Sequence, residues 1–221
     1  MKPTLDLQQL SQQYEQLDHK ARLRQIFRDF DRVLITSSFG TTSTILLHHL
    51  SQVQPHHPVH FIDTKYLFGE THDYKQALID RWNLNVVTIE PTFNSHDFTK
   101  RDYTWTYAAD DCCDMNKVQP LNRLKDSHDV WISGMMGGTN EHRENMPIFR
   151  EGKDILRFYP FIDMTEEEAS WYQLIYDLPA HPLAEEGYGS VGCTHCTVKG
   201  KGREGRWAGS GKTECGLHVS K

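Results

Sequence analysis

The sequence predicts an α/β protein with a doubly wound, mostly parallel sheet. Short apolar runs of strand length alternate with amphipathic segments of helix length along most of the chain, and strands that alternate with helices pair in parallel. The first strand is followed by a loop of small residues and then a helix, which is the first half of a βαβ unit. The 221 residues suffice for one domain whose core needs no disulfides.

The first elements follow directly from the apolar spacing. Residues 5–30 carry apolar side chains three or four positions apart, which predicts one or two amphipathic helices. RVLIT at 32–36 has the length of a buried strand, SSFGTTS at 37–43 is the small-residue loop, and ILLHHL begins the next helix. Together these segments open the first βαβ unit.

The same alternation continues to residue 178. Residues 94–111 are polar and aromatic and predict a loop or an irregular helix, and Thr165 with Glu168 forms a capping box at the start of the last helix. We expect the remaining strands at 57–64, 84–90, 129–135 and 155–164, and the remaining helices at 70–82, 112–126 and 165–178.

The composition of the tail differs from that of the rest. Residues 185–221 are rich in glycine, carry three of the five cysteines and have few aliphatic side chains. Such a segment is held by something other than hydrophobic packing, or is mobile. We therefore expect a helical segment over 1–30, an α/β unit over 31–184 and a distinct tail over 185–221, all within one domain.

Composition and charge exclude several classes of protein. Apolar residues make up 38% and charged residues 24% of the chain, and the mean hydropathy is −0.63. No long apolar run predicts a membrane span, and the N-terminus has no signal-peptide pattern. The net charge of −6 argues against bulk binding of nucleic acid. We expect a soluble cytoplasmic protein with neither membrane nor nucleic acid as partner.

The cysteines carry the most specific chemical signal. Cys112 and Cys113 are adjacent, and Cys193 and Cys196 form a C-x-x-C motif eighty residues later. Four such thiolates bind either a zinc ion or an iron–sulfur cluster. Adjacent cysteines fit poorly around one tetrahedral ion but can occupy different corners of a cubane, which favours the cluster. The alternative for Cys112 and Cys113 alone is ordinary packing.

The fifth cysteine stands apart from the two pairs. Cys215 follows Lys201, Arg203, Arg206 and Lys212 in the tail. A thiol near cations has a lowered pKa and is a nucleophile at neutral pH. The alternative is a free cysteine on a fraying end.

Two glycine- and serine-containing segments are candidates for phosphate binding. The loop at 37–43 offers hydroxyls and backbone N–H groups at a helix N-terminus, which suit phosphate or sulfate, although an ordinary helix cap has the same residues. GSGKT at 209–213 looks like the end of a Walker A motif, but Arg206 stands where that motif needs glycine, so we reject it.

From residue 31 to residue 218 the chain resembles the assimilatory sulfonucleotide reductases. The segments that carry the resemblance are SSFGTTS, FIDTKYLFGET, CCDMNKVQPLNR, EEGYGSVGCTHCT, REGRW and ECGLH. Paired cysteines, C-x-x-C and ECGLH together match the adenylyl sulfate (APS) reductases that carry a [4Fe-4S] cluster. The related enzymes for phosphoadenylyl sulfate (PAPS) keep ECGLH but lack the cluster cysteines.

The resemblance implies a sheet of the PP-loop type and a role for each matching residue. It makes 31–184 a nucleotide-binding unit and 185–221 a cluster-binding and catalytic tail, with Cys215 as nucleophile. The implied cluster ligands are Cys112, Cys113, Cys193 and Cys196. The implied substrate-binding residues are Ser37, Ser38, Phe39, Gly40, Ser43, Asp63, Thr64, Lys117, Arg143, Arg203, Arg206 and His218.

The chain departs from the family pattern in two segments. Lys65 replaces the glycine of the usual LDTG element, and residues 134–140 replace an arginine-containing segment after the fourth strand. Arg143 matches an arginine further on, and Lys65 is a candidate to restore the lost charge.

The resemblance implies reduction of APS to sulfite and AMP through an S-sulfocysteine on Cys215, in assimilatory sulfate reduction. The implied reductant is thioredoxin or glutaredoxin, and the enzyme works as a monomer or a homo-oligomer. The alternatives are a PAPS reductase, a PP-loop sulfurtransferase that activates its substrate with ATP, and a non-catalytic iron–sulfur redox sensor.

Overall fold

The computed structural model describes residues 6–139, 143, 145–209, 212 and 214–218. Its centre is a six-stranded sheet in the order β3-β2-β1-β4-β6-β5. Every neighbouring pair is parallel except β5 and β6, which are antiparallel. The strands are β1 (Val33–Ser37), β2 (Val59–Ile62), β3 (Val86–Ile89), β4 (Val130–Ser133), β5 (Phe149–Glu151) and β6 (Leu156–Phe158).

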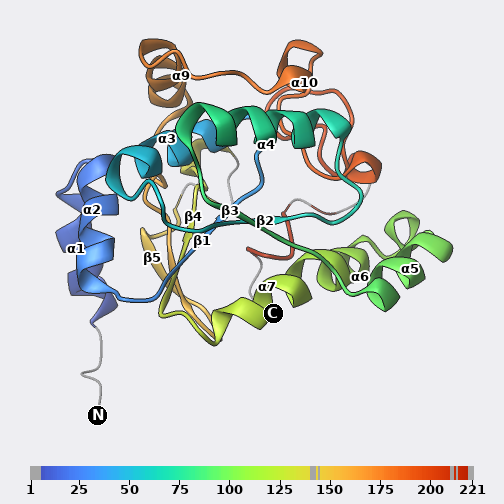
Figure 1. Cartoon of the computed structure of the whole chain (residues 1–221), viewed down its shortest axis with the longest axis horizontal. Coiled ribbons are helices and arrows are strands. Elements are labelled where there is room, and N and C mark those ends of the chain that lie inside the picture. The colour runs from blue at the N-terminus through green and yellow to red at the C-terminus, as the bar shows by residue number, and fades with distance from the viewer. Residues whose placement is uncertain (1–5, 140–142, 144, 210–211, 213, 219–221) are drawn as a thin grey trace.

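The helices alternate with these strands, which confirms the predicted α/β class (Figure 1). They are α1 (Leu7–Glu15), α2 (His19–Asp29), α3 (Ser43–Val53), α4 (Gly69–Trp82), α5 (Phe93–Arg101), α6 (Ala109–Cys113), α7 (Gln119–Lys125), α9 (Glu166–Ile175) and α10 (Pro182–Glu185). One π-helical turn, Asp114–Val118, joins α6 to α7. No helix in these described ranges is long and apolar enough to span a lipid bilayer.

Three local predictions need correction. The edge strand β5 was not expected, because three residues are too few to show an alternating pattern. The segment at 94–111 contains the regular helix α5, which Thr92 caps by accepting a hydrogen bond from the backbone of Ser95. The last strand ends at Phe158 rather than at residue 164, because the chain turns there through hydrogen bonds such as Ile162 N–H to Tyr159 O, 3.2 Å.

Alternate residues of each strand face opposite layers of the molecule. Val33 and Ile35 join the main core, which α2, α3 and α4 cover, whereas Leu34 faces α7. In Figure 1 the helices α3 and α4 lie on one side of the sheet, and α6 and α7 lie on the other. The C-terminal segment returns to this second side, where Leu217 packs beside α7.

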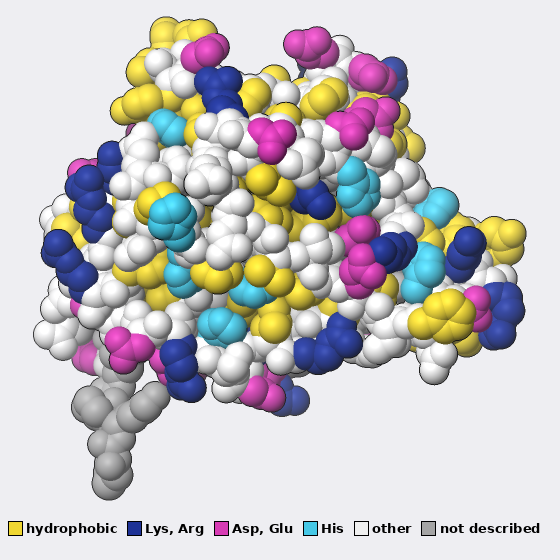
Figure 2. Space-filling model, viewed as in Figure 1, with side chains coloured by type: hydrophobic (Ala, Val, Ile, Leu, Met, Phe, Trp, Pro, Cys, Tyr) yellow, Lys and Arg dark blue, Asp and Glu magenta, His cyan; other side chains and the backbone are white. Residues whose placement is uncertain are grey.

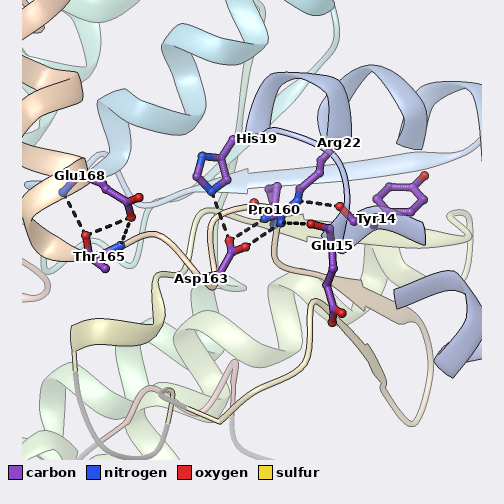
Figure 3. A network of polar contacts seen from close by, with 8 residues as sticks. All are labelled: Tyr14, Glu15, His19, Arg22, Pro160, Asp163, Thr165 and Glu168. Carbon is purple, nitrogen blue, oxygen red and sulfur yellow. Dashed lines mark hydrogen bonds and ion pairs between the residues drawn. The ribbon is translucent and has the colours of Figure 1, made fainter. Parts of the chain in front are cut away.

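The N-terminal helices belong to the same core. Tyr14 of α1 packs edge-on against Phe149 and Phe158, with ring centroids 4.8 and 5.3 Å away. Arg22 of α2 is buried and donates to both carboxylate oxygens of Asp163 at 2.6 Å (Figure 3). This ion pair fastens α2 to the turn that follows β6.

Helix α9 begins with the predicted capping box. The Thr165 hydroxyl accepts from the backbone of Glu168, whose carboxylate accepts from the backbone of Thr165 (Figure 3). Hydrophobic side chains gather on the surface at the end of the molecule that α9 forms (Figure 2). The exposed large ones on and just after this helix are Trp171, Leu174, Ile175 and Tyr176.

The sheet places the loop after β1 at its switch point. The connection from β1 leads to β2 on one side, whereas β4 lies on the other side of β1. Ligands of open α/β sheets bind outside the carboxyl ends of the strands at such a point. The loop at 37–43 therefore lies where the sheet leaves room for a ligand.

Candidate active site

A large pocket opens at the carboxyl ends of β1 and β4. Its walls include Thr36 and Ser37 of β1, Ser133 of β4, and the tail segment 190–192. Ten of the predicted site residues line it: Ser37, Ser38, Gly40, Ser43, Lys117, Arg143, Arg203, Arg206, Cys215 and His218. The fold thus brings together residues that are far apart in the sequence.

The loop after β1 is shaped by a residue that does not face the pocket. Phe39 has a positive φ of 49°, and its fully buried ring packs edge-on against Phe61 at 5.4 Å. The Ser37 hydroxyl accepts from the Phe39 backbone, and the Ser43 hydroxyl donates to the Gly40 carbonyl at 2.7 Å. Phe39 therefore anchors the loop in the core, while its serines and Gly40 form the wall.

A second, smaller pocket is lined by all four paired cysteines. Cys112 and Cys113 come from α6, and Cys193 and Cys196 come from the tail. All five cysteines of the chain are free. The structure therefore brings the two predicted pairs to one place.

Thr64 and Asn116 each place a polar group beside one of these thiols. The Thr64 hydroxyl lies 3.3 Å from Cys193 Sγ. The Asn116 amide lies 3.7 Å from Cys112 Sγ, and Asn116 belongs to the π-helical turn after the paired cysteines. π-Helical turns occur often at functional sites.

The donor set of the small pocket suits a thiolate-bound cluster. Its lining contains four thiols and no carboxylate, and soft thiolates are the ligands of iron–sulfur clusters. No three His, Cys, Asp or Glu side chains in the described part of the chain converge to hold a single metal ion. Burial raises the pKa of Cys112 to about 11, so binding a metal there must displace a proton.

Lys117 lines both pockets. Burial opposes its charge, but the negative charge of the thiolate forms of Cys193, Cys215 and Cys113 outweighs burial and raises the pKa of Lys117. Its ammonium group is therefore positive at neutral pH. The predicted position of Lys117 between cysteines and substrate fits this geometry.

Cys215 lies against the paired cysteines. A hydrogen bond from the Cys113 thiol lowers the pKa of Cys215, burial raises it, and Lys117 lowers it further. The next residue, Gly216, permits this close approach, because an added Cβ would lie 3.3 Å from the Val118 side chain. Cys215 also lines the large pocket, so this residue joins the large pocket to Cys113.

Glu214 is a site residue that the sequence analysis did not single out. Its carboxylate is buried and forms ion pairs with Arg143 at 2.6 Å and Arg203 at 3.0 Å. Burial raises the pKa of Glu214, but these two arginines outweigh burial and lower it. The available signal was its place directly before Cys215 in ECGLH.

Arg206 is the second tail arginine that lines the large pocket, and an aromatic ring positions it. The Arg206 guanidinium lies 4.4 Å from the centroid of the Trp207 ring and donates to the Val191 carbonyl at 3.2 Å. An added Cβ at Gly192 would lie 2.3 Å from this guanidinium. Any larger residue at 192 would displace the Arg206 guanidinium from its present position.

His218 closes the tail against the sheet. Its ring stacks on Trp131 of β4, with centroids 5.4 Å apart and planes 8° from parallel. Burial lowers the pKa of His218 to about 4. The imidazole is therefore neutral at pH 7.

Three predicted substrate-binding residues lie outside the described lining of the large pocket: Phe39, Asp63 and Thr64. Phe39 is in the core, Thr64 lines the cysteine pocket, and Asp63 accepts from the Lys65 backbone at 2.8 Å. Lys65 itself pairs with Glu90 and is 42% exposed. It therefore adds no charge to the described pocket.

The altered segment 134–140 forms part of the pocket wall. Gly134 and Met135 line the pocket, and Met136 is buried in the core. Asn140 lies outside the described residues. The segment supplies no cation, whereas Arg143 does line the pocket.

These features define a nucleotide-binding type of α/β protein with a thiol centre at its switch point. The family model "Phosphoadenosine phosphosulfate reductase domain" matches residues 32–199. This chain belongs to that family.

Two curated relatives named adenosine 5′-phosphosulfate reductase are similar to the chain over most of its length. The protein from Chelativorans sp. (strain BNC1) is 35% identical over 87% of this chain and 81% of its own. The protein from Shouchella clausii (strain KSM-K16) is 32% identical over 86% and 82%, respectively.

Solved structures share the fold. The phosphoadenylyl-sulfate (PAPS) reductase from Candida auris, solved as a phosphate complex, has a TM-score of 0.76 at 22% identity and covers 88% of this chain and 98% of its own. Yeast FAD synthetase has a TM-score of 0.56 at 16% identity, over 90% of this chain and 70% of its own.

Proposed function

We propose that this chain reduces adenylyl sulfate to sulfite and AMP in assimilatory sulfate reduction. The observation that carries the proposal is the position of Cys215, which lines the large pocket beside Lys117 and contacts Cys113. The names of the curated relatives support the same activity. The free cysteines fit a reducing compartment such as the cytoplasm.

The reaction needs a nucleophile and a good leaving group. The Cys215 thiolate forms a bond to the sulfur of the sulfo group, while the bond from that sulfur to the phosphate oxygen breaks. AMP leaves with the electron pair, and the enzyme retains an S-sulfocysteine. The protein's task is to orient the thiolate and to neutralise charge, and Lys117 is placed for both.

A dithiol protein of the thioredoxin or glutaredoxin type completes the cycle. One of its thiolates attacks Cys215 Sγ, and sulfite leaves with the electron pair of the broken S–S bond. The second thiolate of the partner then resolves the mixed disulfide and regenerates Cys215. The partner ends as a disulfide, having supplied both electrons that reduce the sulfur.

We assign a [4Fe-4S] cluster to Cys112, Cys113, Cys193 and Cys196, because these four thiols line one pocket without a carboxylate. When bound, the cluster supplies a fixed charged group beside Lys117 and ties the tail to α6. With Cys113 bound to iron, Lys117 and the backbone N–H of Leu217 would still lower the pKa of Cys215. In this proposal residues 185–221 form the cluster-binding and catalytic tail of a single domain.

The pocket charges favour adenylyl sulfate over its 3′-phosphorylated form. Arg143 and Arg203 are already paired with Glu214. Lys117 and Arg206 have no carboxylate partner among the residues that the structure describes. These two cations match the two negative charges of the phosphosulfate group. Because Arg143 and Arg203 share one carboxylate, they leave a single surplus positive charge, which is less than the roughly two negative charges that a 3′-phosphate adds.

The experiment is sulfite release by the anaerobically purified enzyme with thioredoxin as reductant. Adenylyl sulfate and phosphoadenylyl sulfate are compared in separate assays, and we expect a higher kcat/KM for adenylyl sulfate. A higher kcat/KM for the 3′-phosphorylated nucleotide would make the chain a PAPS reductase. Release from neither nucleotide would leave the sulfurtransferase or the redox sensor as the function.

A further inference from the structure

Both oxygens of the Glu214 carboxylate are fully engaged. Oε2 accepts from Arg143 Nε at 2.7 Å and forms an ion pair with Arg143 Nη2 at 2.6 Å. Oε1 accepts from Arg203 Nη2 at 3.0 Å and from the backbone N–H of Cys215 at 2.8 Å. The side chain is only 4% exposed. A buried carboxylate that accepts three hydrogen bonds and forms ion pairs with two arginines is fixed in position.

These contacts join three separate parts of the chain. Arg143 lies 71 residues before Glu214 and follows β4, while Arg203 lies 11 residues before it in the tail. The hydrogen bond to the Cys215 amide transmits this fixation to the next residue. The Cys215 sulfur belongs to the same residue as this amide, so fixing the amide also restricts the position of the sulfur.

We infer that Glu214 is a positioning residue that holds the Cys215 backbone over the large pocket, and that Arg143 and Arg203 act on this carboxylate. The inference rests on the proposed function only in treating Cys215 as the nucleophile. It changes the role of two predicted substrate-binding arginines, because their guanidinium groups fasten the tail. Lys117 and Arg206 remain as the cations for the substrate.

The pocket geometry separates the two pairs of cations. Arg206 is held by Trp207 and the Val191 carbonyl, and no ion pair joins it to a carboxylate in the described part of the chain. Arg203 and Arg143, by contrast, already have a buried anion. Loss of Glu214 must therefore affect the placement of Cys215 more than the binding of nucleotide.

The test compares Glu214→Gln with Glu204→Gln in the iron-loaded protein. Glutamine keeps the shape of Glu214 but removes the charge that pairs with both arginines. Glu204 is an exposed carboxylate in the same tail and serves as the matched control. Glu214→Asp keeps the charge on a shorter side chain and is the conservative variant.

The first readout does not depend on catalysis. Hydrogen–deuterium exchange of the peptide that contains Cys215 should be at least tenfold faster in Glu214→Gln and unchanged in Glu204→Gln. The second readout is one turnover with adenylyl sulfate and no reductant. The rate of S-sulfocysteine formation should fall at least tenfold in Glu214→Gln, the nucleotide Kd should stay within threefold, and Glu214→Asp should recover part of the rate.

Unchanged exchange and an unchanged turnover rate in Glu214→Gln would overturn the inference. So would a large loss of nucleotide affinity at an unchanged rate, since the arginines would then act on substrate. If wild-type enzyme forms no S-sulfocysteine, the proposed function fails, while the exchange measurement still decides whether Glu214 holds the tail.

A second variant is used if Glu214→Gln fails to bind iron or to fold, as judged by its circular dichroism. Arg203→Gln removes one partner of the same carboxylate and carries the same expectation for exchange, rate and affinity. Where both single variants fold, the double variant should be no slower than Glu214→Gln alone, because the two residues act as one unit. If the losses of rate in the two single variants add up in the double variant, Glu214 and Arg203 act independently.

Discussion

The Thr64 hydroxyl lies 3.3 Å from Cys193 Sγ and joins the end of β2 to the C-x-x-C motif of the tail. The backbone strengthens the same junction, because Thr194 N–H donates to the Tyr66 carbonyl at 2.7 Å and Leu67 pairs with Cys193 in an isolated bridge. The tail cysteines are therefore fixed to the sheet by the segment that follows β2. A cluster held by both cysteine pairs would add a further link, to α6.

Thr64→Val should weaken cluster retention without unfolding the protein. Valine has nearly the same shape but removes the hydroxyl that lies near Cys193 Sγ, and groups that hydrogen-bond metal ligands typically contribute 10–100-fold to metal affinity or activity. We expect iron to be lost severalfold faster to a chelator, measured by the decay of absorbance near 400 nm.

Thr88→Val is the matched control, since Thr88 lies on the neighbouring strand β3 with its side chain exposed. It should lose iron at the wild-type rate. Equal rates of iron loss in wild type, Thr64→Val and Thr88→Val would show that the Thr64 hydroxyl does not stabilise the cluster.

Lys65→Ala should leave nucleotide binding within twofold of wild type. The ammonium group pairs with Glu90 and is outside the described lining of the large pocket. Lys117→Ala, which removes a cation that does line the pocket, should weaken binding clearly. A comparable loss in Lys65→Ala would show that Lys65 reaches the substrate after all.

The backbone at position 65 gives an independent prediction. Lys65 has a φ of 63°, in the left-handed region where only glycine has no steric cost. Lys65→Gly should therefore be more stable than Lys65→Ala by about 1 kcal/mol, since both variants lose the same ion pair. Urea denaturation measures this difference in the free energy of unfolding. Equal values for Lys65→Gly and Lys65→Ala would show that the backbone at position 65 is not strained.

The fold could be predicted largely because each parallel strand leaves a local apolar signal. The five strands with parallel partners are short runs rich in apolar residues. Val33–Ser37 and Val130–Ser133 are mostly buried, whereas Val86–Ile89 at the other edge is partly exposed. The edge strand Phe149–Glu151 carries no such signal, because it exists only through its pairing with β6. Pairing between strands is a property of the whole sheet and not of three residues.

Only those parts of the candidate site that leave a local sequence pattern could be predicted. Cysteine spacing is a local pattern, and it led to the four thiols that share a pocket. The place of Glu214 before Cys215 does not reveal its partners, because these are arginines 71 and 11 residues away. Thr64 was expected near the nucleotide, and its contact with Cys193 depends on how the tail folds back over the sheet.

Asp163→Asn should destabilise the attachment of α2 in a pH-dependent way. Burial raises the pKa of Asp163, but hydrogen bonds and charge from Arg22, with His19, outweigh burial and lower it to about 2. The ion pair thus contributes stability that is complete above the ordinary pKa of 3.8 and is lost as the pH falls toward about 2. Because the Asp163 side chain is 51% exposed, we expect a loss of only about 1 kcal/mol at pH 7.

Thermal unfolding of both proteins between pH 7 and pH 3 measures this contribution. The difference in Tm should be constant from pH 7 to pH 5 and should narrow as the pH falls below 4. Asp177→Asn is the control, because that carboxylate is 99% exposed and lies 3.5 Å from Arg81. If the difference in Tm between wild type and Asp163→Asn grows as the pH falls, the pKa of Asp163 is raised by folding and not lowered.

Cys215→Ser should separate catalysis from cluster binding. Cys215 lines the large pocket but is absent from the lining of the cysteine pocket, so its loss should leave iron content and visible absorbance unchanged. A serine hydroxyl has a far higher pKa than a thiol and forms no S-sulfo intermediate, so sulfite release should fall to background. Nucleotide Kd should stay within a few-fold, because the loop after β1, Lys117 and Arg206 are intact.

Cys196→Ser should give the opposite pattern, since its thiol lines the cysteine pocket. Iron content should fall, and release of the metal should loosen the tail, which has few aliphatic residues of its own. In wild-type enzyme given adenylyl sulfate but no reductant, mass spectrometry should find one SO₃ group on the Cys215 peptide, and added thioredoxin should remove it as sulfite. Normal turnover by Cys215→Ser, or an SO₃ group on any other cysteine, would assign the nucleophile elsewhere, because only the attacking sulfur can carry the group.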